Sequence, residues 1–80
     1  RIVKTDAKNM FVSEHPFGDG RAGVILVNNS RTGFEGEINV AEGWNVMSSI
    51  VDDAEQAEWR AGNHLRLSGN AGILLMMEKK

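Results

Sequence analysis

The sequence predicts an all-β protein: a small antiparallel β-sandwich of about six to eight strands with Greek-key-like connections. Apolar segments rich in β-branched residues recur roughly every 8–12 residues, and each is too short for a stable helix. Clusters of Gly, Asn, Asp and Ser separate these segments, and such residues tolerate the backbone conformations of tight turns. The chain has 80 residues, which is enough for one domain spanning residues 1–80.

The first part of the chain contains three expected strands. Residues 1–5 form a short strand, and residues 10–15 are rich in strand formers. Residues 17–20 form a turn, because Asp-Gly is a strong hairpin signal. Pro16 lies at a strand end, where its missing N–H matters least. The nearly continuous apolar run at 22–27 fits a central strand that is buried on both faces.

The middle of the chain alternates turns with half-exposed strands. Residues 28–33 form a turn. Residues 34–40 alternate apolar with acidic side chains, which predicts one strand with its acidic side in water. Residues 44–51 form the next strand. Because side chains alternate along a strand, we expect one face of it to carry Trp44, Val46, Ser48 and Ile50.

The last third of the chain continues the β pattern. Residues 52–56 allow a single helical turn, which one of its two aspartates caps. Three further short strands are expected, at 56–60, 65–67 and 73–77. Met76 and Met77 point to opposite faces of the terminal strand, where flexible methionines fill gaps in a core or at a domain interface.

The composition excludes several classes of function. The net charge is −2, which argues against a nucleic-acid or anionic-membrane surface, since both need a basic excess. No apolar run approaches the ~18 residues of a membrane span. The chain has no cysteine, so it offers neither a disulfide framework nor a cysteine-based zinc site. The compartment stays open, because secreted, periplasmic and cytoplasmic locations all fit this composition.

No motif predicts a catalytic residue, a cofactor or a metal site. Residues 18–23 match G-x-G-x-x-G, but a strand-forming run follows instead of the helix that a dinucleotide site requires. We interpret them as a hairpin turn. His15 and His64 lack the surroundings of a catalytic triad. The acidic residues of 52–58 fit a solvated loop better than a carboxylate pair or a calcium site. The glycosylation sequon at 28–30 is also a natural turn sequence.

The two tryptophans are the candidate contact residues. Trp44 is in phase with apolar residues of its strand, which predicts a core anchor. Trp59 stands between Glu58 and Arg60, beside the acidic loop, so we expect it to contact either a sugar or a neighbouring domain. Two exposed indole rings side by side would offer sugars a flat surface for stacking.

Several segments together resemble a recurring passage of glycoside hydrolases. They are Phe11 to His15, Asp19 to Ser30, the Gly43-Trp44 start, and the closing runs Leu65 to Leu67 and Gly72 to Leu75. This passage is similar to the C-terminal β-sandwich that follows the (β/α)₈ barrel in the α-amylase clan and in β- and α-galactosidase-type enzymes. The catalytic carboxylates of such enzymes lie on the barrel, so the resemblance implies no catalytic residue here.

The resemblance predicts a non-catalytic C-terminal accessory domain of a glycoside hydrolase. One face of the sandwich would pack against the catalytic barrel of the same polypeptide, and the other would stay polar. The chain starts at Arg1 without an initiator methionine, so we expect it to be a piece of a longer protein. Two alternatives remain open: a carbohydrate-binding module that contacts polysaccharide through Trp59 and Trp44, and an interaction domain of the immunoglobulin or fibronectin type.

Overall fold

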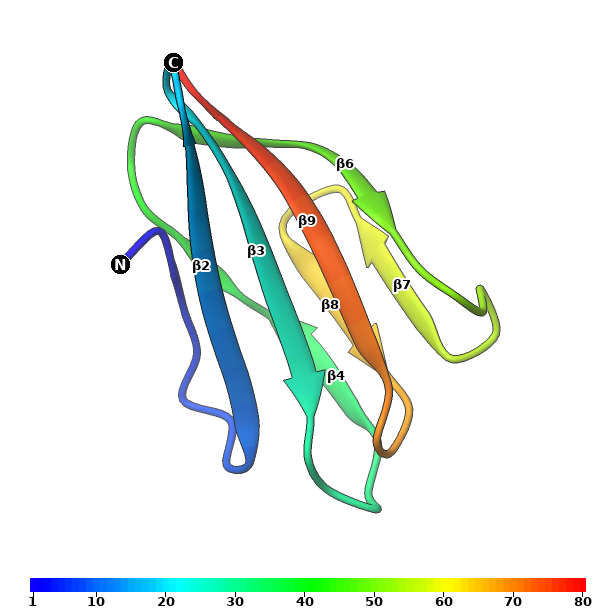
Figure 1. Cartoon of the computed structure of the whole chain (residues 1–80). Coiled ribbons are helices and arrows are strands. Elements are labelled where there is room, and N and C mark those ends of the chain that lie inside the picture. Colours follow the sequence, from blue (N-terminus) through cyan, green and yellow to red (C-terminus); the bar gives the residue numbers. More distant parts are fainter.

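A computed structural model describes residues 1–80 and confirms the predicted all-β class (Figure 1). The strands are β1 (Val3–Lys4), β2 (Met10–Gly18), β3 (Arg21–Asn28), β4 (Phe34–Glu37), β5 (Asn39–Val40), β6 (Trp44–Ile50), β7 (Ala57–Arg60), β8 (His64–Leu67) and β9 (Gly72–Lys79). Seven of them have four residues or more, whereas β1 and β5 have two each. The fold contains no helix that is long and apolar enough to cross a membrane.

The longer strands form two antiparallel layers that face each other (Figure 1). One layer has the order β2-β3-β9-β6 and the other the order β4-β8-β7, while β1 pairs with β5 alone. The order in the larger layer is non-sequential, because the chain leaves this layer after β3 and after β6 and returns to it as β6 and as β9. These crossings tie the two layers together as a β-sandwich.

The core lies between the layers and receives side chains from both. Ten buried hydrophobic residues form one cluster: Val3, Val24, Leu26, Ile38, Ala57, Leu65, Leu67, Ile73, Leu75 and Met77. Fully burying a side chain such as leucine contributes roughly 1.5–3 kcal/mol, so this cluster is the main source of stability. Trp44 and Trp59 are partly buried and pack against its margin.

Strand β3 is central, as predicted, because it pairs with β2 on one side and β9 on the other. Val24 and Leu26 are fully buried between the layers. Ile25 and Val27 point to the opposite face and are only half-buried. The predicted burial on both faces therefore holds for the inner face alone, since no third layer covers the outer one.

The predicted common face of residues 44–51 is wrong, and the cause is a β-bulge. Trp44 and Val46 pack against the core. The register of β6 against β9 shifts between Val46 and Ser48, which inserts Met47 as an extra residue. Beyond the bulge the side-chain phase is inverted, so Ile50 pairs with Leu74 on the outer face and is 55% exposed.

Two further segments differ from the expected strand and helical turn. The predicted strand at 34–40 is divided into β4 and β5 at Ile38, which is 2% exposed and whose N–H donates to the carbonyl of Asn63. Residues 52–56 form a turn and no helix. Asp53 closes this turn, because its carboxylate accepts a hydrogen bond from the backbone N–H of Glu55 at 2.9 Å.

The turn between β8 and β9 packs against the turn between β3 and β4, and Gly69 is the point of contact. A Cβ atom on Gly69 would overlap the backbone carbonyl group of Arg31 and lie 3.0 Å from the carbonyl oxygen of Ser30. We predict that Gly69→Ala lowers the free energy of unfolding by about 1–3 kcal/mol, measured by urea denaturation. Gly33→Ala is the matched control, since its nearest neighbour, the carbonyl oxygen of Leu67, would lie 3.5 Å away. Equal losses in both variants would contradict the prediction.

Candidate functional site

The outer face of the four-stranded sheet carries a group of apolar side chains, which is unusual for the water-facing side of a sandwich. Its apolar side chains, called here the apolar face, lie beside polar residues such as Ser13, His15 and Ser48, and they are Phe11, Phe17, Ile25, Val27, Ile50, Leu74 and Met76. Three of them are more than half exposed: Phe11 at 52%, Phe17 at 58% and Ile50 at 55%. An extended apolar surface of this kind marks an interaction site more often than a solvated one.

The strand register makes the apolar face continuous. Phe11 on β2 pairs with Val27 on β3, Ile25 on β3 pairs with Leu74 on β9, and Leu74 pairs in turn with Ile50 on β6. Side chains of directly opposed residues are close enough to touch. A shallow hollow of about 300 Å³ lies among Ile25, Ile50 and Leu74 and gives the face a concave region.

Phe17 extends the apolar face because Gly23 leaves room for its ring. The register of β2 against β3 shifts between Pro16 and Gly18, which places Phe17 in a bulge. A Cβ atom on Gly23 would lie 2.8 Å from the Phe17 ring and 3.3 Å from a methyl group of Leu74. The ring therefore closely approaches the backbone of β3 at Gly23 while remaining 58% exposed.

The opposite outer face, on the three-stranded sheet, is charged. Glu35 contacts Arg60 at 3.4 Å and His64 at 3.0 Å, and Glu58 contacts Arg60 at 3.5 Å and Arg66 at 3.8 Å. Exposed pairs of this kind stabilise a fold by at most about 1 kcal/mol each. Their effect is on solubility, so the sandwich has one outer face suited to water and one suited to contact.

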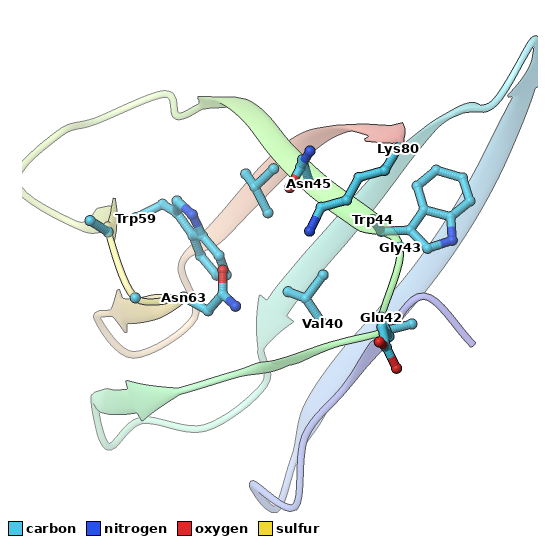
Figure 2. Close-up of a pocket in the computed structure, with 12 residues that line it drawn as sticks. Val40, Glu42, Gly43, Trp44, Asn45, Trp59, Asn63 and Lys80 are labelled. Atoms are coloured by element: carbon cyan, nitrogen blue, oxygen red, sulfur yellow. The ribbon is translucent and has the colours of Figure 1, made fainter.

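The second feature is an open pocket of about 400 Å³ at one end of the sandwich, and it contains both predicted contact residues. Its lining comes from the end of β5, the turn before β6, the start of β6, the β7–β8 hairpin and the residue that follows β9. In Figure 2 the indole of Trp59 is directed toward the middle of the pocket, next to Asn63. The indole of Trp44 lies at the other end and extends away from Trp59, with Lys80 between them. The two rings therefore share a pocket without forming one flat surface.

The remaining sequence motifs have structural roles. The predicted hairpin turn forms at Asp19 and Gly20, which have φ values of 55° and 72°, while Arg21 to Gly23 already belong to β3. The hydroxyl of Ser13 contacts the ring of His15 at 2.7 Å on the exposed surface, and no carboxylate is hydrogen-bonded to that ring to complete a triad. Asn28 of the sequon is 2% exposed. No group of three or more His, Asp or Glu side chains is arranged to hold a metal ion.

The sequence-based prediction of contact residues named the two tryptophans and did not include the apolar face. Two signals for it are present in the sequence: the unbroken apolar run of β3, and the consecutive apolar residues of β9. Such runs are typical of strands that are covered on both faces. The positions of Phe17 and Ile50 were not predictable in this way, because both depend on bulges.

Comparison with known proteins gives no relative for this chain. No protein-family model matches it, and no curated protein or solved structure is significantly similar to it. The functional argument therefore depends on the apolar face, the pocket and the sequence resemblance described above.

Proposed function

We propose that this chain is a non-catalytic accessory domain that packs its apolar face against a second domain of the same polypeptide. The observation that supports this proposal is the contrast between the two outer faces. The face of the four-stranded sheet carries Phe11, Phe17 and Ile50 in water, whereas the face of the three-stranded sheet carries ion pairs. A domain with no partner gains no stability from an exposed apolar face, and such a face promotes aggregation.

The partner we propose is the catalytic (β/α)₈ barrel of a glycoside hydrolase, which is the neighbour that the sequence resemblance implies. The outside of such a barrel is a ring of helices, and a flat sheet can pack on helices through aliphatic and aromatic side chains. In this arrangement β2, β3, β9 and β6 supply contacts and the charged face remains in water. The reaction itself takes place on the barrel, and this chain stabilises the barrel.

Polar substitution of the apolar face tests the docking. In the double variant Phe11→Thr/Ile50→Thr, we expect the free energy of unfolding of the isolated chain to change by about 1 kcal/mol or less, because both side chains are already exposed. Binding to the separately produced catalytic domain should weaken by at least about 30-fold, because aromatic and aliphatic side chains that become buried on binding dominate interfaces. Isothermal titration calorimetry measures this change.

Glu37→Thr/Glu58→Thr is the matched control, since it places two threonines on the charged face. It should bind the catalytic domain as the unmodified chain does. Equal binding by both double variants would show that the apolar face is not the docking surface. If the gene encodes no barrel domain next to this chain, the barrel is the wrong partner, and an interaction domain of the immunoglobulin or fibronectin type becomes the better description.

A further inference from the structure

The pocket between the β5–β6 and β7–β8 turns has an apolar floor and polar groups around it. Val40 and Val46 line it together with Trp59, Asn45 and Asn63. The side-chain amides of both asparagines and the indole N–H of Trp59 take part in no hydrogen bond within the chain, and none of these atoms is buried without a partner. These donors and acceptors are therefore solvated and available to a ligand.

The backbone holds this pocket in one shape. Gly43, Gly62 and Asn63 have φ values of 92°, 84° and 56° and form two tight turns. The carbonyl of Gly43 accepts from the N–H of Lys80 at 2.7 Å, and the carbonyl of Asn63 accepts from the N–H of Ile38 at 2.9 Å. A site held in this way loses little conformational entropy when it binds a ligand.

The charges around the pocket favour an uncharged ligand. Glu42 and Lys80 are the charged residues in the lining, and neither forms an ion pair. In Figure 2 the Lys80 side chain reaches over the pocket and the Glu42 carboxylate lies at its rim. Their charges are opposite, so their fields partly cancel where a ligand would lie. A volume of about 400 Å³ is within the usual range for small-molecule sites.

We propose that this pocket binds one neutral hexopyranose unit, independently of the apolar face. The aliphatic C–H side of the sugar ring packs on the indole of Trp59, whose electron-rich face attracts weakly positive hydrogens. The hydroxyl groups exchange hydrogen bonds with the side-chain amide of Asn63, which can both donate and accept. Trp44 lies at the far end of the pocket, where its ring extends away from Trp59, and it packs against the core.

Nuclear magnetic resonance of the full chain tests this site, because its two tryptophans give two indole N–H signals. The probes are methyl α- and β-glucopyranoside, methyl α- and β-galactopyranoside, maltotriose and cellotriose. We expect at least one of them to shift the Trp59 signal and the side-chain amide signals of Asn63 in a saturable way. The signals of Phe11 and Ile25 on the apolar face should not move.

Asn63→Gly removes the amide and keeps the left-handed backbone, and it should weaken binding about three- to ten-fold. Asn70→Gly is the matched control: Asn70 has a φ of 62° and lies outside this pocket, so its replacement should leave binding unchanged. Saturable shifts confined to residues outside the pocket, equal binding by both variants, or no shift with any probe would overturn the proposal. None of these outcomes bears on docking through the apolar face, because the surfaces are separate.

Discussion

Replacing Asn28 with aspartate is expected to lower the free energy of unfolding by about 3–5 kcal/mol. Asn28 is 2% exposed at the end of β3. Its side-chain amide donates toward the carbonyl oxygens of Thr32 at 2.9 Å, Ser68 at 3.3 Å and Leu67 at 3.4 Å. A carboxylate cannot donate to these oxygens and places a buried negative charge against them, which is among the most unfavourable changes in a protein interior.

Urea denaturation at neutral pH measures this loss. Asn29→Asp is the matched control, because Asn29 is the next residue, is exposed, and its side chain forms no hydrogen bond within the chain. We expect it to change the free energy of unfolding by about 0.5 kcal/mol or less. A loss of similar size in both variants would mean that the buried amide of Asn28 does not join β3 to the β8–β9 turn.

The second large effect is expected from a pair of adjacent leucines on β9. Leu75 is fully buried between the layers, so Leu75→Ala should lower the free energy of unfolding of the isolated chain by about 2–5 kcal/mol through lost burial and a new cavity. Leu74 is half-buried on the apolar face, so Leu74→Ala should lower it by about 1 kcal/mol. The residue type, strand and substitution are the same, and only the face differs.

The same pair separates stability from docking. In the proposed complex with a catalytic domain, Leu74→Ala should weaken binding by about ten-fold, because docking through the apolar face would bury the side chain that the isolated sheet leaves half-exposed. Calorimetry measures this binding in the absence of urea, at a temperature at which both variants are folded. Equal destabilisation of the isolated chain by both variants would show that the outer face is already part of a packed core.

Most of the fold was predictable because short apolar segments separated by turn residues leave few alternatives. The hairpin at Asp19-Gly20 and the central position of β3 follow directly from local sequence. The inverted phase of β6 did not, since nothing in Val46-Met47-Ser48 marks a bulge. The division of the strand at 34–40 also depends on a distant partner, the carbonyl of Asn63.

The candidate sites were predictable to different degrees. The selection of Trp59 and Trp44 came from residue type alone, and the fold brings both to one pocket with their rings apart (Figure 2). The side-chain amide of Asn63 had no local signal, because the pocket that it lines forms only when β5, β6 and the β7–β8 turn come together. The apolar face had a signal in β3 and β9, but its extent depended on strand order.

Methionine oxidation tests most directly whether the apolar face is covered in the intact protein. Met76 is half-buried on that face, and its neighbour Met77 is 2% exposed in the core. In the isolated chain, hydrogen peroxide should oxidise Met76 well before Met77, as peptide mass spectrometry will show. In the longer polypeptide that we propose, Met76 should react at least about ten-fold more slowly while Met77 stays unreactive. Oxidation of Met76 at the same rate in the parent and in the isolated chain would contradict docking through the apolar face.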